Sequence, residues 1–220
     1  MKADLHIHSI HSPDGSNEVK DIIRILRSQG INGAAFTDHN SVEGGREALG
    51  LKEKDFLVIP GVEVSTIEGH IIALNVTEPI ERNLSVIETI HRIHGLGGIA
   101  VAAHPYRFWS GLGEENIIGQ PFDAVEVLNG RSNDRGNAKA VKLARDLKAP
   151  VTAGSDSHEN MTLGDAFTVF PEGTETIDQA IQAILHHQTK TGGRSRNVSH
   201  TVKYVTKSVS EWIGRGMRRM

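Results

Sequence analysis

The chain has 220 residues and a formal net charge of −3, and it contains no cysteine. This length allows one main domain with a sizeable core and lies in the range where an α/β barrel is a single domain. The lack of cysteine excludes disulfide bonds and thiolate zinc sites, so imidazole and carboxylate groups must bind any metal. The N-terminal residues leave no room for a signal peptide, and no segment reaches about 18 consecutive apolar residues. We therefore expect a soluble cytoplasmic protein without a membrane span.

Short β-rich runs alternate with amphipathic stretches along the chain. The first half predicts a strand at 2–8, a helix at 18–29, a strand at 33–37, a helix at 42–49, strands at 56–64 and 70–76 and a helix at 84–94. The second half predicts strands at 99–102 and 124–128, a helix at 137–147, strands at 150–153 and 167–170 and a helix at 177–187. Such repeated strand–helix alternation is typical of an α/β fold with a mostly parallel sheet.

The predicted loop at 106–121 carries the adjacent aromatic residues Phe108 and Trp109 close to a histidine of metal-ligand type. Such a loop either forms a lid or wall of a substrate site or is an ordinary surface loop. The sequence pattern leaves both interpretations open.

Basic residues are concentrated in the C-terminal segment 190–220, which holds eight lysines and arginines against Glu211 alone. A polar linker at 189–197 precedes a predicted basic amphipathic helix from 198 to about 215. We expect a main domain at 1–189 and a helical tail at 190–220 that is not an independent domain. The tail is expected to pack on its own barrel or on a second subunit, with contact to nucleic acid or an anionic membrane as the alternative. The rest of the chain is acidic, which a solvated surface or bound cations would explain.

Residues of metal-ligand type gather at or just past the ends of predicted strands. His6 and His8, one residue apart on an extended segment, point to the same side, as ligands of one metal must. Later segments add imidazoles and carboxylates at strand ends, where open sheets and barrels place their sites. The full candidate set is His6, His8, Asp14, His39, Glu63, His70, His104, Asp156 and His158. Imidazoles bind borderline metals and carboxylates balance charge and bridge ions, so the set predicts a polynuclear metal site.

Several ordered motifs carry a family resemblance over roughly residues 1–170. They are Asp4-Leu5-His6-Ile7-His8, Ser12-Pro13-Asp14-Gly15, Thr37-Asp38-His39-Asn40, Gly61-Val62-Glu63, Ala103-His104-Pro105 and Gly154-Ser155-Asp156-Ser157-His158. With them the sequence resembles the PHP (polymerase and histidinol phosphatase) family of metal-dependent phosphoesterases, and most of all its small stand-alone members. The resemblance implies a distorted (β/α)7 barrel with two or three divalent metal ions at the C-terminal ends of its strands.

The resemblance also implies how the ligands are shared among the metals. One metal would be held by His6, His8, Glu63 and Asp156. A second would be bridged to the first by Glu63 and bound also by His104 and His70. If His70 points away, that second metal is weaker or absent, because Asn75 stands where some relatives have a histidine. A third would be held by Asp14, His39 and His158.

Acidic and basic neighbours of these ligands complete the predicted site. Asp4 and Asp38 each stand next to a ligand histidine and are assigned to orient an imidazole, with a structural hydrogen bond at the barrel end as the alternative. Charge on a phosphoryl group favours a guanidinium partner, for which Arg107 is well placed. Arg131 and Arg135 are further candidates for substrate binding. Each of the three arginines has a role on the surface as its alternative.

These assignments predict a metal-dependent phosphoesterase that acts on a small phosphomonoester or a nucleotide. The nucleophile is expected to be a hydroxide activated by zinc, manganese or iron, since no serine or cysteine nucleophile is indicated. Glu63 and Asp156 are the expected catalytic ligands, and Arg107 is the expected phosphate-binding residue.

Three other functions stay open. The same centre would serve an exonuclease on short single-stranded RNA or DNA, with the basic tail gathering the strand. An amidohydrolase also begins with His-x-His on its first strand, but that family bridges its metals with a lysine, and here Glu63 has the bridging role. A non-catalytic module would bind metal for stability alone, although such degenerate domains usually lack several of the ligands that this chain has.

Overall fold

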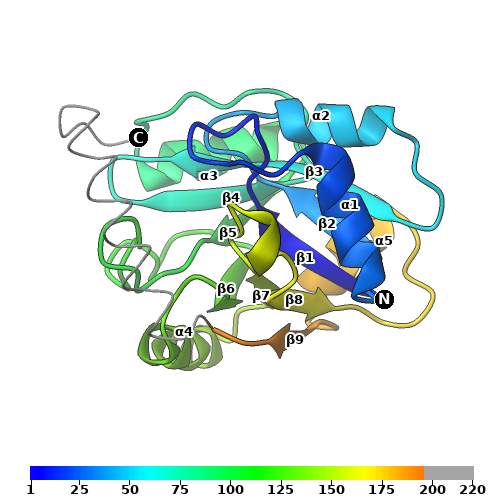
Figure 1. The fold of residues 1–220 in the computed structure, drawn as a ribbon. Coiled ribbons are helices and arrows are strands. Elements are labelled where there is room, and N and C mark those ends of the chain that lie inside the picture. The colour runs from blue at the N-terminus through cyan, green and yellow to red at the C-terminus, as the bar shows by residue number, and fades with distance from the viewer. Residues whose placement is uncertain (196–220) are drawn as a thin grey trace.

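The strands of the computed structural model, which describes residues 1–195, follow one another around a sheet that closes on itself (Figure 1). The sheet runs in chain order, and pairing of the first strand with the eighth closes the barrel, while the ninth adds to the eighth. The strands are β1 (Lys2–Ile7), β2 (Gly33–Phe36), β3 (Leu57–Ser65), β4 (His70–Leu74), β5 (Ile99–Ala102), β6 (Ala124–Asn129), β7 (Val151–Gly154), β8 (Ala166–Val169) and β9 (Lys190–Gly193).

Five α-helices in residues 1–195 connect and cover these strands: α1 (Val19–Ser28), α2 (Glu43–Gly50), α3 (Val86–Gly95), α4 (Asp134–Leu147) and α5 (Ile177–Leu185). Local sequence fixes where several of them begin. A capping box begins both α3 and α5. The side chains of Ser85 and Thr176 each accept a hydrogen bond from the backbone N–H three residues later, and the side chain of that later residue accepts one from the backbone N–H of the capping residue. Asn133 caps α4 by accepting from the backbone N–H of Gly136.

The α/β barrel expected from the sequence is confirmed, and two strands account for its distortion. β4 and β8 run antiparallel to both of their neighbours in the barrel, whereas the other neighbouring pairs are parallel. A turn at 66–69 connects β3 directly to β4, with no helix between the two strands. The C-terminal ends of the six parallel strands therefore share one end of the barrel with the beginning of β4.

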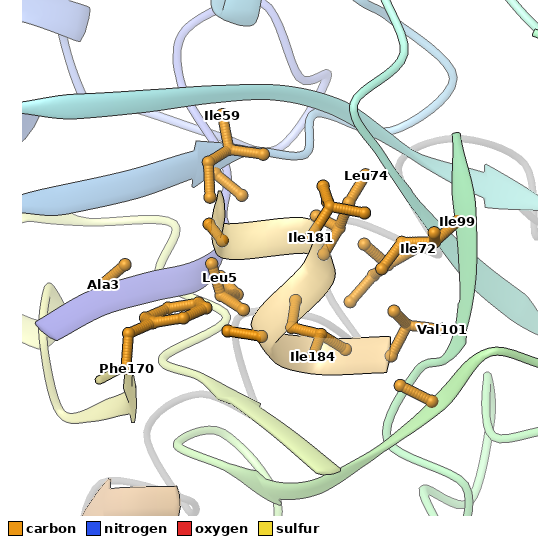
Figure 2. Packing of buried hydrophobic residues seen from close by; sticks show 14 of the residues in the cluster. Ala3, Leu5, Ile59, Ile72, Leu74, Ile99, Val101, Phe170, Ile181 and Ile184 are labelled. Atoms are coloured by element: carbon orange, nitrogen blue, oxygen red, sulfur yellow. The ribbon is translucent and has the colours of Figure 1, made fainter. Parts of the chain in front are cut away.

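Apolar side chains fill the opposite end of the barrel. Leu5, Ile72 and Val101 from β1, β4 and β5 pack there against Ile181 and Ile184 of α5 (Figure 2). The outer faces of the strands pack in separate clusters against α1, α3 and α4. Because α5 and its apolar partners occupy one end, polar side chains are left with the other end of the barrel.

An irregularity in β1 brings the first ligand-type residues inside. Asp4 pairs with Ala34 of β2 and Ile7 pairs with Phe36, so β1 takes one more residue than β2 over this stretch. Such a bulge interrupts the in–out alternation of a strand and re-aims its side chains. As a result Leu5 packs in the apolar core while the next residue, His6, also points into the barrel.

The C-terminal end of the described chain differs from the predicted linker. Residues 190–193 form β9, which pairs antiparallel with β8, so the sheet continues past the domain boundary predicted at residue 189. The predicted basic helix at 198–215 lies outside the described residues. Among the helices of residues 1–195, none is long and apolar enough to cross a membrane.

Candidate metal centre

Glu63 of β3 lies at the centre of the polar end of the barrel and is almost completely buried. Its Oε1 lies 2.8 Å from Nδ1 of His70 and 2.8 Å from Nε2 of His104. Its Oε2 lies 3.2 Å from a ring nitrogen of each of three further histidines, His6, His8 and His39. Five imidazoles from different parts of the chain therefore converge on one carboxylate.

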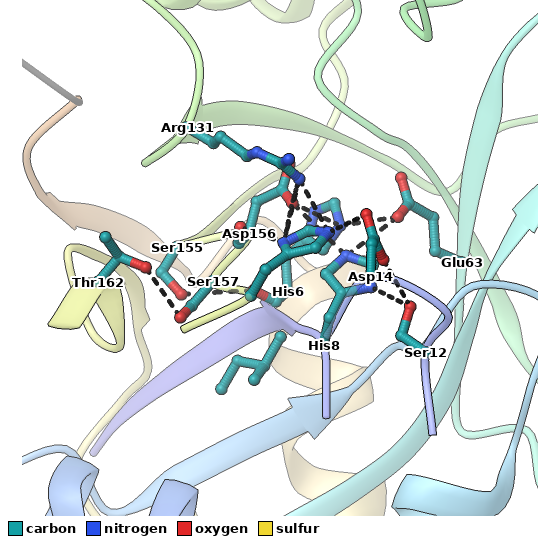
Figure 3. Close-up of polar contacts among 12 residues, drawn as sticks. His6, His8, Ser12, Asp14, Glu63, Arg131, Ser155, Asp156, Ser157 and Thr162 are labelled. Carbon is teal, nitrogen blue, oxygen red and sulfur yellow. Dashed lines mark hydrogen bonds and ion pairs between the residues drawn. The ribbon is translucent and has the colours of Figure 1, made fainter. Parts of the chain in front are cut away.

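The remaining ligand-type residues lie beside this group (Figure 3). Asp156 follows β7, and its Oδ1 lies 3.5 Å from Nε2 of His8 and 3.9 Å from Nε2 of His6. Asp14 approaches Nε2 of His158 with its Oδ2 at 2.9 Å. All nine side chains that the sequence analysis proposed as ligands are thus brought together at one end of the barrel, including His70 at the beginning of β4.

The nitrogen atoms of this cluster test whether it suits metal ions. Nε2 of His6 and of His8 and Nδ1 of His39 are buried but have no hydrogen-bond partner, although all three face Oε2 of Glu63. A buried polar atom without a partner is costly, and coordinated cations would satisfy these nitrogen atoms. Four sets of ligand atoms lie within 4.8 Å of one another: His8, Asp14, His39 and His158; His6, His104 and Asp156; His6, His8 and Glu63; His39, Glu63 and His70. The residues therefore fit divalent metal ions. Which of these ligands would bind which ion stays a prediction.

The imidazoles of the cluster fall into two electrostatic groups. Burial lowers the pKa of His39 well below its ordinary value, and burial together with a nearby arginine lowers the pKa of His104 to about 4 and of His158 to about 3. Burial also acts to lower the pKa of His8, but the nearby carboxylates of Asp156 and Glu63 outweigh it and raise that pKa to about 9. The first group is neutral at physiological pH, which is the state that binds a metal.

The two central carboxylates are held ionised by their neighbours. Burial acts to raise the pKa of Glu63, but the surrounding imidazoles of His39, His70 and His6 keep it well below its ordinary value. Burial acts likewise on Asp156, where Arg107 and His6 bring the pKa well below the usual range. Ionised carboxylates beside the neutral imidazoles of the first group form a donor set suited to divalent cations.

Glu126 of β6 is a site residue that the sequence analysis missed. Its carboxylate is buried and accepts a hydrogen bond of 3.0 Å from Nδ1 of His6 and one of 2.8 Å from the backbone N–H of His104. Nε2 of His6 is thereby directed at Glu63. The sequence signal for it was an acidic residue within the apolar strand sequence Ala-Val-Glu-Val-Leu. Its carboxylate has the function of orienting an imidazole that was expected of Asp4 and Asp38.

Asp4 and Asp38 hold backbone groups, and within residues 1–195 neither forms a hydrogen bond or ion pair with an imidazole. Asp4 accepts hydrogen bonds from the backbone N–H groups of Ser155 at 2.8 Å, Gly164 at 3.0 Å and His6 at 3.3 Å, and its burial raises its pKa to about 7. Asp38 accepts from the backbone N–H and the hydroxyl of Ser9. The expected role of orienting an imidazole is corrected here to the structural alternative, because these side chains fix the segments that carry the ligands.

The three candidate arginines have different positions. Nη2 of Arg107 lies 2.5 Å from Oδ2 of Asp156 and donates to Asn129 Oδ1 at 2.7 Å. Nη1 of Arg131 lies 3.4 Å from Oδ1 of Asp156 and 2.8 Å from Nε2 of His158. The side chain of Arg135 is exposed on α4 and makes no hydrogen bond or ion pair with another described residue. The structure therefore places Arg107 and Arg131 at the centre but not Arg135.

Two family models match the chain. The model of the PHP domain matches residues 4–112, and the model described as PHP-associated matches residues 134–189. The chain belongs to the PHP family.

Relatives of this PHP protein include an uncharacterized protein of Methanocaldococcus jannaschii, MJ1587. It is 41% identical over 147 residues, which are 61% of this chain and 85% of the relative. A 5'-3' exoribonuclease of Haemophilus influenzae is 40% identical over 79 residues, which are 34% of this chain and 28% of the exoribonuclease.

Solved structures share the fold of this PHP protein. One is a two-domain protein of Bacteroides vulgatus containing a predicted PHP-like metal-dependent phosphoesterase, with a TM-score of 0.71 and 18% identity. The match covers 88% of this chain and 65% of that one. Another is a lesion-specific endonuclease of Pyrococcus furiosus, with a TM-score of 0.66 and 21% identity over 88% of this chain and 57% of the endonuclease.

Proposed function

We propose that this PHP protein hydrolyses a small phosphomonoester or a nucleotide at a centre of two or three divalent metal ions. The convergence of five imidazoles on Glu63 carries this proposal, because it gathers more nitrogen donors than one ion needs. Imidazole-rich coordination suits zinc, iron and manganese. The proposed ligands are His6, His8, Asp14, His39, Glu63, His70, His104, Asp156 and His158.

The side chains of the chain have distinct tasks in this proposal. When bound, divalent ions supply positive charge to the phosphoryl oxygens and lower the pKa of a water molecule from about 15.7 toward about 7. Glu63 presents one carboxylate oxygen to His70 and His104 and the other to three further imidazoles, so it is placed to bridge two ions. Glu126 fixes the ring of His6 so that Nε2 faces the centre.

Arg107 is the proposed phosphate-binding residue. Among the described residues only its Nη2 is engaged, by Asp156 and Asn129. A guanidinium has five N–H donors, so those on Nε and Nη1 stay available to a phosphoryl oxygen next to Asp156. Arg131, which contacts Asp156 and His158, would add positive charge on the same side.

Turnover by metal-loaded protein tests this function. We expect protein reconstituted with Zn²⁺, Mn²⁺ or Fe²⁺ to hydrolyse glycerol phosphate, nucleoside monophosphates or simple phosphodiesters. The double variant His6→Ala, His8→Ala is the control, and it is expected to lose this activity because both rings face Glu63 and Asp156. Equal turnover by the double variant, or none by the loaded protein on any of these esters, would count against the proposal.

A second candidate is exonuclease action on short single-stranded RNA or DNA. It is supported by the local likeness to an exoribonuclease and by the eight basic residues of segment 190–220. We propose that the part of this segment after β9 is an appendage of the barrel domain, and that the charges of the segment attract a nucleic acid backbone. Replacing Lys203, Lys207, Arg215, Arg218 and Arg219 by glutamine in the full chain should then weaken hydrolysis of oligonucleotides and its salt dependence. Hydrolysis of glycerol phosphate is the internal reference, and an equal loss on both substrates would contradict this role.

A further inference from the structure

Phe108 and Trp109 are the most exposed large hydrophobic side chains in residues 1–195, at 86% and 80%. Their rings meet edge to face, with centroids 4.7 Å apart and an interplanar angle of 82°. Neither ring contributes to the four apolar core clusters of the described chain. Two adjacent aromatic rings left in solvent form a surface that a flat apolar group can cover.

Hydrogen bonds fix this pair beside the metal centre. The backbone N–H of Arg107 donates to the carbonyl of His104 at 3.0 Å, and the backbone N–H of His70 donates to the carbonyl of Ser110 at 3.0 Å. The two aromatic residues therefore stand between one anchor on ligand His104 and another on ligand His70. Because consecutive Cα atoms are about 3.8 Å apart, each ring begins within roughly 10 Å of the backbone of a ligand.

The loop that carries the pair is also joined to the most accessible of the proposed ligands. His70 is the most exposed of the nine proposed ligands, with 15% of its side chain accessible, and its backbone is bonded to the residue after Trp109. Arg107, which contacts Asp156, precedes Phe108 directly. The arginine and the two aromatic residues are thus consecutive in the chain, and the next residue is hydrogen-bonded to His70, the most accessible proposed ligand.

The loop that carries the pair is built before any ligand arrives. Its turn is closed by hydrogen bonds from Gly111 N–H to the Arg107 carbonyl at 3.0 Å and from Gly113 N–H to the Pro105 carbonyl at 2.9 Å. A Cβ on Gly69 would lie 3.0 Å from the backbone of Leu112, so the turn between β3 and β4 packs directly against this loop. A preformed platform loses little conformational entropy on binding.

We propose that Phe108 and Trp109 stack on the nucleobase of a nucleotide whose phosphate group lies at the metal centre. This inference rests on the proposed function and narrows its substrate to esters that carry a base. A nucleotide combines a phosphate for Arg107 and the centre with a flat ring for the aromatic pair, within one small molecule. Stacking of bases on aromatic side chains tolerates any base, so the platform selects nucleotides over sugar phosphates without reading sequence.

Fluorescence of Trp109 measures the stacking without turnover. The chain has two tryptophans, and Trp212→Phe leaves Trp109 as the only one. We expect the phosphonate analogue of AMP, in which a methylene group replaces the ester oxygen, to quench this fluorescence. The matching phosphonate of ribose 5-phosphate, which has no base, should quench it little. Phe108→Ala should weaken binding of the AMP analogue roughly fivefold or more. Equal quenching by both analogues would overturn the proposal, as would a blue shift with phosphatidylglycerol vesicles and no response to the AMP analogue.

Kinetics with matched substrates give the second arm. The double variant Phe108→Ala, Trp109→Ala should lower the ratio of kcat/KM for AMP to that for glycerol phosphate by roughly five- to a hundredfold. Ile118→Ala, an exposed residue of the same loop, is the control and should leave the ratio unchanged. A dinucleotide with a 5′-phosphate distinguishes a strand from a mononucleotide, because a larger ratio change on it indicates the strand. An unchanged ratio in the double variant overturns the proposal that the two rings stack on a base. Absence of turnover on every ester in the wild type overturns the proposed function instead, and the fluorescence result then decides whether the base is bound.

Discussion

Glu126 shows how a carboxylate outside the ligand set shapes the metal centre. It accepts from Nδ1 of His6 and from the backbone N–H of His104, and Nδ2 of Asn129 donates to the same carboxylate at 3.0 Å. The hydrogen bond to Nδ1 selects the tautomer of His6 that leaves Nε2 free for a metal. One buried carboxylate therefore sets the orientation of one proposed ligand and the backbone of another.

Replacing this carboxylate should weaken metal binding more than it weakens the fold. We expect Glu126→Gln to lower metal affinity about 10–100-fold, because its amide cannot accept from both groups as the carboxylate does. Isothermal titration of chelator-treated protein with Zn²⁺ or Mn²⁺ measures the change. Glu115→Gln, on the exposed part of the loop after β5, is the matched control. Identical affinities for the two variants would show that Glu126 does not orient His6.

Asp4 has a different task, and its variant should reveal a different loss. Its carboxylate accepts from three backbone N–H groups, two of them buried, on His6 and Ser155, and one partly buried, on Gly164. Asp4→Ala leaves these donors without a partner, so we expect the metal-free protein to lose about 3 kcal/mol or more of its unfolding free energy. Urea denaturation in the presence of a chelator measures this. If the metal-free stability is unchanged and only metal affinity falls, Asp4 acts through the centre and not through the backbone.

At the scale of elements, periodicity predicted the helices and barrel strands well, and it failed where tertiary contacts decide. The residues of β9, Lys-Thr-Gly-Gly, carry no strand pattern, and they become extended by pairing with β8. The helix predicted at 137–147 begins at Asp134, because Asn133 supplies a cap in front of a polar first turn. The directions of β4 and β8 depend on neighbours across the barrel, which periodicity does not show.

Close packing between β7 and β1 is a second element-scale feature. A Cβ on Gly154 would lie 2.3 Å from Cβ of His6 and 2.5 Å from its backbone nitrogen. Gly154→Ala must therefore push β1 away from β7 at the position of a proposed ligand. We expect a loss of about 1–3 kcal/mol in unfolding free energy together with lower metal occupancy.

Gly95→Ala is the matched control for this substitution. Gly95 ends α3, and a Cβ there meets no atom within 4 Å. Alanine should stabilise the protein by about 0.4–1 kcal/mol, since it restricts the unfolded chain. Thermal denaturation and metal analysis of both variants measure the contrast. Should Gly154→Ala be as stable and as metal-loaded as Gly95→Ala, the contact between β7 and His6 would not constrain the centre.

For the molecule as a whole, the ligand types were readable in sequence because most of them stand at or just past the end of a predicted strand. Glu126 was not, since its partner His6 lies 120 residues away and only closure of the barrel brings the two together. The orienting role was assigned to Asp4 instead of Glu126 for the same reason. Neighbours in sequence can point to opposite faces, while residues of β1 and β6 face each other across the barrel.

Removal of metal should therefore be felt by the whole barrel. The proposed ligands come from β1, β3, β4 and the segments after β1, β2, β5 and β7, so bound ions would tie most strand ends of one barrel end together. Binding to the folded state alone stabilises it by about 2.7 kcal/mol at a free metal concentration of 100 Kd. We expect a chelator to lower the unfolding free energy by about that amount and to lower Tm, and we expect Zn²⁺ or Mn²⁺ to restore both. Calorimetry of the same sample before and after chelation measures this, with the variant His6→Ala, His8→Ala as a reference whose Tm should respond much less. A chelation-independent Tm in protein that metal analysis had shown to be loaded would mean that the ions do not link the strand ends.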